Sequence, residues 1–278
     1  FSVAHEVRTP MASLVALVEI LGDDCDRLPP DELSAVVSKI SRAVVRLNTL
    51  VENVLDAGSI RAGRFTVRLG PVDLSEVIEV AVATIAPLLE EKGQHVRVVG
   101  VDGVDMPQSS SKYSDALGAD MTHSGAVGAG FRQSLSEYSS AVGAGVTPGL
   151  VLQLPAAWGD ARRLGQVMAN LIGNASKYGP TGDEITVRLA RGGQGQLGRP
   201  MVKVSVTDNG PGIPLPEQAD VFERHFRASS AVFAAPGTGL GLAITRAIIE
   251  AHGGTVGLDS EPGAGTTVWF TVPQAPAG

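Results

Sequence analysis

The chain has 278 residues, 44% of them apolar, which is enough for one large domain or two smaller ones with their own cores, and we favour two. The formal net charge of -7 argues against nucleic-acid binding, because neutralising phosphates requires clustered Lys and Arg, and the sequence has no such cluster. The single cysteine excludes an internal disulfide, and the longest apolar run, 11–21, is interrupted by polar residues and too short to span a bilayer.

Residues 1–60 carry the heptad pattern of a helical hairpin. Apolar residues recur at alternating spacings of three and four over 7–25 and again over 33–54. The segment 28–31 contains two prolines that end the first helix, and Pro30 or Asp31 can begin the second. Each helix buries its seam only if another pair faces it, so the pattern predicts a four-helix bundle made by dimerisation. The alternative is a hairpin that packs on its own neighbouring domain.

Residues 61–278 alternate strand and helix patterns after a joint near 57–63. The alternation predicts an α+β fold, in which a helical hairpin is followed by an α/β sandwich of one sheet with helices on a face. The Gly-rich stretch 191–200 predicts a hairpin loop. The expected elements are strands at 65–69, 95–99, 184–190, 201–207, 255–258 and 266–272, and helices at 73–89, 160–178 and 240–252.

One segment departs from this alternation. From about 100 to 149 the chain is rich in Gly, Ala and Ser and has few large apolar residues, so we expect a poorly ordered insertion between two sheet elements. Short helical pieces, for example at 131–138, are compatible with it.

A histidine lies near the start of the first helix. His5 is followed by Glu6, and Thr9 lies one turn further along the same face. Pro10 cannot donate a backbone hydrogen bond, which loosens the helix around the histidine. A neutral imidazole is a competent nucleophile at cellular pH, and a neighbouring carboxylate can accept its proton. The alternative for an isolated His-Glu pair is a histidine on a polar surface.

The predicted helix 160–178 has an apolar stripe, which ends at Tyr178, and a polar stripe that contains Asn170, Asn174 and Lys177. Amide oxygens suit Mg²⁺ that is already neutralised by phosphates, since this ion takes few protein ligands. A lysine one turn further can meet the phosphate charge. An ordinary solvated face would explain the two asparagines alone.

Two glycine-rich motifs follow. The segment 208–212, Asp-Asn-Gly-Pro-Gly, comes directly after a strand, where the Asp208 carboxylate can accept a hydrogen bond from an exocyclic amine, although a bare Asp-Asn-Gly is usually a turn. The segment 237–242 begins a helix, whose free backbone amides form an anion site. A dinucleotide fingerprint would need glycine at position 242, and a P-loop would need a Gly-Lys pair, which the sequence lacks.

In this order the motifs resemble those of the sensor histidine kinases of two-component systems. The resemblance implies a HisKA-type dimerisation and phosphoacceptor domain at 1–60 and a GHKL-type ATP-binding catalytic domain at 61–278. His5 would accept the phosphoryl group, Glu6 would act as its acid/base partner, and Thr9 would help to position water when a partner is dephosphorylated. This part of the resemblance rests on the segment His5-Glu6-Val7-Arg8-Thr9-Pro10, which resembles the family's phosphoacceptor motif, the H box.

The resemblance also implies ATP and Mg²⁺ as cofactors. Asn174 would be the Mg²⁺ ligand, Lys177 would contact phosphate and Asp208 would bind the adenine amino group. Residues 221–227 resemble the F box, and the chain up to 236 would form a lid over ATP. The helix 160–178 resembles the N box, the segment 208–213 the G1 box, and the segment 237–242 the G2 box. The nucleotide-binding residues expected from the N, G1, F and G2 boxes are Asn170, Asn174, Lys177, Tyr178, Asp208, Gly210, Gly212, Arg227, Thr238, Gly239, Leu240 and Gly241.

The expected activity is Mg·ATP-dependent autophosphorylation of His5, followed by transfer to an aspartate of a response regulator and, by the same resemblance, dephosphorylation of that partner. The expected partners are a second copy of the chain and a receiver domain. Because the chain begins at Phe1, we interpret it as the cytoplasmic portion of a membrane-anchored bacterial sensor whose upstream region is absent. The alternatives are a non-catalytic or phosphatase-biased scaffold and an ATP-driven conformational clamp.

Overall fold

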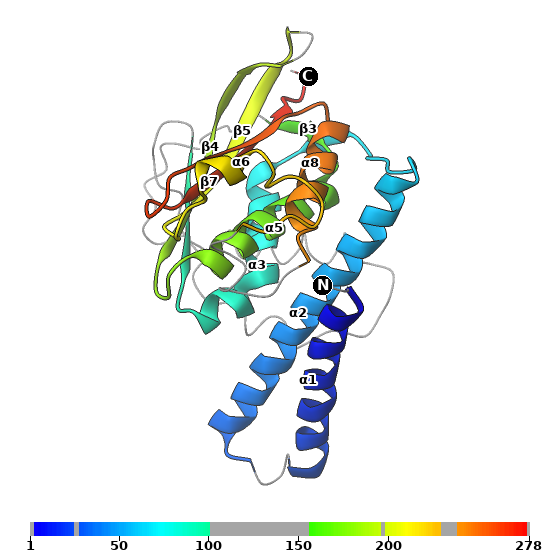
Figure 1. Cartoon of the computed structure of the whole chain (residues 1–278), viewed down its shortest axis with the longest axis vertical. Coiled ribbons are helices and arrows are strands. Elements are labelled where there is room, and N and C mark those ends of the chain that lie inside the picture. Colours follow the sequence, from blue (N-terminus) through cyan, green and yellow to red (C-terminus); the bar gives the residue numbers. More distant parts are fainter. Residues whose placement is uncertain (1–2, 25–27, 101–155, 196–197, 229–237, 277–278) are drawn as a thin grey trace, which may run out of the picture. The chain divides into compact units, whose positions relative to one another are not determined.

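The computed structural model describes residues 3–24, 28–100, 156–195, 198–228 and 238–276. Two long helices, α1 (Val3–Asp24) and α2 (Pro30–Arg61), come first and lie side by side as a hairpin (Figure 1). The second begins at Pro30, as predicted, and acidic residues in its first turn complement the positive end of the helix dipole. None of the described helices is both long and apolar enough to cross a bilayer.

The hairpin leaves much of its apolar seam uncovered. In α2 only three residues are buried, namely Ala43, Asn53 and Asp56. A single hairpin therefore does not satisfy its own heptad pattern, which is the property expected of half a four-helix bundle. The exposed seam residues include Met11, Val18, Val37, Val44, Val51 and Val54.

The second region is built on a five-stranded mixed sheet. The strand order is β2-β4-β5-β7-β6, with β2 parallel to β4 and the other pairs antiparallel. A separate pair, β1 (Gly70–Val72) with β3 (Ala157–Gly159), is antiparallel. The strands of the large sheet are β2 (His95–Val99), β4 (Glu184–Gln194), β5 (Pro200–Asp208), β6 (Val256–Ser260) and β7 (Thr266–Pro273).

Three helices cover one face of this sheet (Figure 1). They are α3 (Leu74–Glu91), α5 (Ala161–Tyr178) and α8 (Gly241–Ala251), and a single turn, α6 (Leu215–Gln218), follows β5. Alternate strand residues point into the core, as the period of two requires, so that β5 buries Val202, Val204 and Val206. The predicted α+β class with a helical hairpin is confirmed.

Several boundaries differ from the sequence prediction. The expected strand at 65–69 is wrong: this segment is not part of a sheet ladder, because the backbone N–H of Arg68 donates to Asp160 Oδ2 (3.0 Å). The strand pairing instead begins at β1. The three-residue β3 was missed, and β4 runs into the expected loop as far as Gln194.

The predicted joint and insertion have different outcomes. Helix α2 continues through Arg61, so most of the expected joint at 57–63 is helical. Beyond Gly100, the predicted insertion at 100–149 lies outside the described residues, and so does the helical piece at 131–138.

Candidate active site

The N-terminus of α5 is held by a capping carboxylate and a buried histidine. Asp160 accepts hydrogen bonds from the backbone N–H groups of Arg68 and Arg163, and these overcome the effect of burial, so that the pKa of Asp160 is lowered. The backbone N–H of Asp160 donates to His252 Nε2 (2.9 Å), and His252 Nδ1 lies 2.7 Å from the carbonyl oxygen of Ile248. Burial lowers the pKa of His252, which keeps the ring neutral and able to accept at Nε2.

A buried ion pair joins α2 to the first turn of α5. Arg163 Nη1 lies 2.7 and 2.6 Å from the two carboxylate oxygens of Asp56, and Gln166 donates to the same carboxylate at 2.7 Å. The Arg163 guanidinium also stacks 4.7 Å from the ring centroid of Phe65. Arg163 and Gln166, which belong to the polar stripe of α5, therefore bind α2 instead of facing a ligand.

The middle of the polar stripe contacts α8. Asn170 Nδ2 donates to Thr245 Oγ1 (2.9 Å), and a Cβ atom at Gly241 would overlap the Asn170 amide. Glycine at position 241 lets α8 begin this close to α5 without displacing the Asn170 amide. The asparagine of the N box and the last glycine of the G2 box therefore meet in the fold.

Asn174 and Lys177 follow Asn170 along the same helix and are partly exposed. Among the described residues, Asn174 has no side-chain hydrogen-bond partner. The Lys177 ammonium lies 4.7 Å from the ring centroid of Tyr178. An amide and an ammonium are thus available to a ligand on this face.

Strand alternation buries the carboxylate of Asp208. This residue is in phase with the core residues of β5 and is 9% exposed. Burial raises the pKa of Asp208 to about 6, against the opposing effect of hydrogen bonds from the backbone of Gly210 and Thr266, and the Asp183 carboxylate raises it further. Desolvated in this way, the carboxylate can bind a donor such as an exocyclic amine strongly.

Glycines beside Asp208 bring neighbouring segments close. A Cβ atom at Gly210 would lie 2.8 Å from Asp208 Oδ1 and 2.9 Å from the carbonyl oxygen of Tyr178, so the end of α5 packs against the G1 box. Gly212 has a φ of 70°, and a Cβ atom there would overlap the carbonyl oxygen of Glu261.

The F box packs against the G2 box. His225 has a φ of 63°, and its backbone N–H donates to the carbonyl oxygen of Gly239 (2.9 Å). Gly239 has a φ of 66° and leaves no room for a Cβ atom against Phe226. The hydroxyl of Thr238 accepts from the backbone N–H of the buried Leu240 (3.3 Å), just before α8. The expected lid up to residue 236, apart from its first residues, lies outside the described part of the chain.

The fold therefore joins four of the five predicted boxes in one connected group: the N box contacts the G1 and G2 boxes, and the F box contacts the G2 box. Arg227 is half-buried at the edge of this group. None of the contacts named above involves His5, Glu6 or Thr9. All three lie in α1, where Thr9 is exposed and where only the backbone of His5 and Glu6 is described.

The side chains of this site are suited to a metal ion only if phosphate oxygens supply its other ligands. The described residues contain no group of three or more His, Cys, Asp or Glu side chains that could hold a metal ion. The Asn174 amide on α5, which has no hydrogen-bond partner within the described part of the chain, is suited to Mg²⁺ that also binds phosphate oxygens.

Sequence reasoning missed several residues that build the site. They act through contacts between segments far apart in the chain, namely Asp56 with Arg163, Thr245 with Asn170, and Lys92 and Gln94 with the end of α5. Only Lys92-Gly93 carried a local signal, since a glycine after a helix is a common helix terminator.

Two family models match the chain. The model described as "His Kinase A (phospho-acceptor) domain" matches residues 2–63, and the model described as "Histidine kinase-, DNA gyrase B-, and HSP90-like ATPase" matches residues 159–276. Together they cover the hairpin and most of the sheet region.

Curated relatives match almost the whole chain. The "Probable sensor histidine kinase TcrY" of Mycobacterium tuberculosis is 31% identical over 264 residues, which are 94% of this chain and 42% of that protein. The "Signal transduction histidine-protein kinase/phosphatase MprB" of Mycobacterium bovis is 27% identical over 277 residues, 97% of this chain and 43% of that protein. The chain thus spans less than half the length of these relatives.

A solved structure shares the fold. Full-length ShkA in complex with AMPPNP superposes with a TM-score of 0.56 at 24% identity, covering 99% of this chain and 45% of that one. With the phosphoacceptor and ATPase models matched in this order and with relatives named as histidine kinases, the chain belongs to the sensor histidine kinases.

Proposed function

We propose that this chain is a transmitter region that phosphorylates its own His5 from Mg·ATP and passes the phosphoryl group to an aspartate of a response regulator. Two contacts carry the proposal: Asn170 lies against Gly241, and Tyr178 lies against Gly210. Together they place the amide-bearing face of α5, the buried Asp208 and the start of α8 next to one another. This arrangement offers a carboxylate at one end and amide, ammonium and helix N-terminal groups at the other, which suits a base linked to phosphates.

The nucleotide would be held at both ends. Asp208 accepts from the adenine amino group, and Gly210 and Gly212 leave space for the flat base. Lys177 and the backbone amides at the start of α8 bind the phosphates, with Arg227 as a further cation and Thr238, Gly239 and Leu240 shaping the turn.

Asn174 would hold the Mg²⁺, with Asn170 supporting the phosphates beside it. When bound, the ion neutralises charge on the β- and γ-phosphates. The protein itself contributes mainly positioning and a fixed electrostatic environment.

The phosphoryl transfer is an in-line displacement at the γ-phosphorus. An imidazole nitrogen of His5 forms a bond to the γ-phosphorus, and the bond from that phosphorus to the β–γ bridging oxygen breaks, so that ADP leaves with the electron pair. Glu6 accepts the proton released from the other ring nitrogen. Thr9 then helps to position water when the same region dephosphorylates the regulator.

The proposal includes the assembly and its place in the cell. Two hairpins cover each other's exposed seams in a four-helix bundle, and the region works on the cytoplasmic side of a membrane-anchored bacterial sensor, where ATP is available. Reaching the nucleotide requires His5 and the ATP-binding region to move relative to each other, and we assign this motion to the last turn of α2 and the residues up to Gly63.

The test is incubation with γ-labelled ATP and Mg²⁺, comparing the parent chain with His5→Gln and Asn174→Ala. We expect acid-labile, base-stable label on the parent and none on His5→Gln, although His5→Gln should still bind Mg·ATP because the residue lies outside the nucleotide site. Asn174→Ala should lose most of the label through weaker Mg·ATP binding.

Other outcomes would favour other functions. A parent that binds and hydrolyses Mg·ATP without forming phosphohistidine would be a conformational clamp. A parent that binds no nucleotide would be a non-catalytic scaffold.

A further inference from the structure

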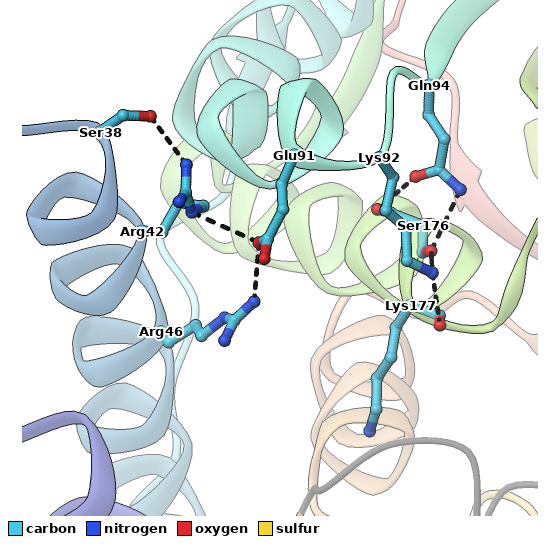
Figure 2. Close-up of polar contacts among 8 residues, drawn as sticks. All are labelled: Ser38, Arg42, Arg46, Glu91, Lys92, Gln94, Ser176 and Lys177. Atoms are coloured by element: carbon cyan, nitrogen blue, oxygen red, sulfur yellow. Dashed lines mark hydrogen bonds and ion pairs between the residues drawn. The ribbon is translucent and has the colours of Figure 1, made fainter. Parts of the chain in front are cut away.

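A lysine outside the predicted boxes closes the C-terminal end of α5. Lys92 Nζ donates to three backbone carbonyl oxygens, those of Ser176 (2.7 Å), Lys177 (2.9 Å) and Gly179 (3.1 Å). Figure 2 shows the Lys92 side chain pointing at this end of the helix. An ammonium has three N–H donors, so all three donors of Lys92 are taken up by these carbonyl oxygens. Carbonyls at the end of an α-helix have no partner within the helix itself.

The end of α3 explains why Lys92 lies there. The backbone N–H of Gln94 donates to the carbonyl oxygen of Leu89 (3.0 Å) and that of Gly93 to Glu90 (3.1 Å), which is the Schellman pattern, and Gly93 has the required φ of 60°. This turn reverses the chain beside α5.

Gln94 supports the same end of the helix. Its Nε2 donates to the carbonyl oxygens of Ser176 (3.2 Å) and Pro180 (2.8 Å), and its Oε1 accepts from the Ser176 hydroxyl (2.6 Å). The last turn of α5 is therefore held by side chains from a different part of the chain, with Gln94 itself buried.

This end of the helix faces an electrostatic difficulty. The C-terminal carbonyls of a helix carry a partial negative charge of about half an electron, which repels phosphates. Asn174 and Lys177 lie in the last two turns, so a triphosphate bound by them would approach that negative end. The Lys92 ammonium neutralises it from the opposite side, while the Lys177 side chain points away from Lys92 (Figure 2).

We propose that Lys92 is a positioning residue for the phosphate and Mg²⁺ end of the nucleotide site: it holds the last turn of α5 and cancels its negative end. The inference rests on the proposed function, because it concerns Mg·ATP at that site. Lys92 itself would touch no ligand and would act through Asn174 and Lys177.

The neighbouring residue provides a matched control. Glu91 points toward α2, where its carboxylate lies 3.1 Å from Arg46 Nη2 and 3.4 Å from Arg42 Nε (Figure 2). Glu91→Gln therefore breaks an ion pair at the same end of α3 without touching α5.

The experiment compares the parent with Lys92→Met, Lys92→Gln, Lys92→Arg and Glu91→Gln in two measurements. The first is amide hydrogen exchange of residues 174–178 without nucleotide. The second is the affinity for ATP with Mg²⁺ and with EDTA, from which the gain due to Mg²⁺ is calculated for each protein.

We expect Lys92→Met to speed exchange in the last turn of α5. It should also weaken ATP binding by about fivefold in EDTA and by less with Mg²⁺, because the uncancelled helix end repels free ATP more strongly than the less negative Mg·ATP. Lys92→Arg should restore both, because guanidinium also donates to carbonyls. Glu91→Gln should leave both at parent values. If Lys92→Met does not fold, Lys92→Gln, which keeps a donor but no charge, should show the same larger loss of affinity in EDTA.

The outcomes separate this inference from the proposed function. A parent that binds no ATP overturns the proposed function and this inference with it. A parent that binds Mg·ATP, with Lys92 variants that keep the parent affinity in EDTA or lose affinity equally with and without Mg²⁺, overturns the inference alone and leaves Lys92 a purely structural residue.

Discussion

The hairpin and the sheet region solve the burial of apolar side chains in opposite ways. In the sheet region, alternate strand residues and the faces of α3, α5 and α8 close one core, in which Phe270, Val187 and Ile248 are fully buried. In the hairpin, seam residues such as Val18 (57% exposed) remain uncovered. A sheet with helices on one face is complete within one chain, whereas a heptad seam requires partners of its own kind.

Two ion-paired sites between α2 and the sheet region repeat this contrast. Asp56 and Arg163 form a buried, hydrogen-bonded pair, whereas Glu91 meets Arg42 and Arg46 near the surface. Burial decides the energetic weight of each contact, since water screens the exposed pair.

The largest effect should come from filling a glycine of the sheet region that has both a positive φ and no room for a side chain. Gly265 has a φ of 88°, and a Cβ atom there would overlap the carbonyl oxygen of Asp208. We expect Gly265→Ala to lower the free energy of unfolding by about 3 kcal/mol or more, measured by urea denaturation. The control is Gly58→Ala in α2, where nothing lies within 4 Å of the new Cβ atom, and which should raise the free energy of unfolding by about 0.5 kcal/mol. Equal shifts would contradict the difference in packing between the regions.

The second largest effect on the free energy of unfolding should come from breaking the buried pair of Asp56 and Arg163. Asp56→Asn leaves the Arg163 guanidinium buried without a counter-charge, so we expect a loss of about 3 kcal/mol in the free energy of unfolding. Glu91→Gln should cost less than about 1 kcal/mol, because that pair is half-exposed. Urea unfolding of both variants checks the comparison. Similar losses would mean that burial does not separate the two contacts.

Asp208 should make the stability of the sheet region depend on pH. Its pKa is about 6 in the folded state against its ordinary value of 3.8, so between these values the folded state binds more protons than the unfolded state. The free energy of unfolding should therefore fall as pH rises from about 4 to about 6, and remain reduced above it. Asp208→Asn should remove this fall and be more stable by about 2 kcal/mol at pH 8, while binding ATP about tenfold more weakly. Parallel pH profiles of the free energy of unfolding for parent and variant would contradict this role of Asp208.

The smallest expected effect concerns the uncovered seam. Val44 is 41% exposed on the heptad stripe, and Val44→Glu should weaken the proposed dimer by about tenfold, since a charge would enter the bundle interface. Ala35→Glu makes the same change in charge on the opposite face of α2 and should leave dimerisation unchanged. Sedimentation equilibrium measures both, and a parent chain that remains monomeric would contradict the bundle itself.

Much of the fold and of the site could be predicted from local patterns. The helix at 160–178 and the strand at 95–99 match α5 and β2 closely, because long amphipathic and alternating segments are dominated by their own periodicity. The strand expected at 65–69 failed, although it alternates, because the hydrogen bond of Arg68 goes to a side chain more than ninety residues away. Periodicity indicates which face of a segment is apolar, but it does not identify the group to which the backbone N–H donates its hydrogen bond.

The sequence by itself determined the kinds of chemistry: amides on one helix face, a carboxylate after a strand, and glycines where segments must approach closely. These follow from residue type and spacing, which are local properties. Only the tertiary structure decided that Asn170 meets Gly241, that Asp56 pairs with Arg163, and that Lys92 closes the end of α5. Such contacts join segments 71 to 107 residues apart, and their geometry depends on how the sheet, the helices and the turn at Gly93 pack together.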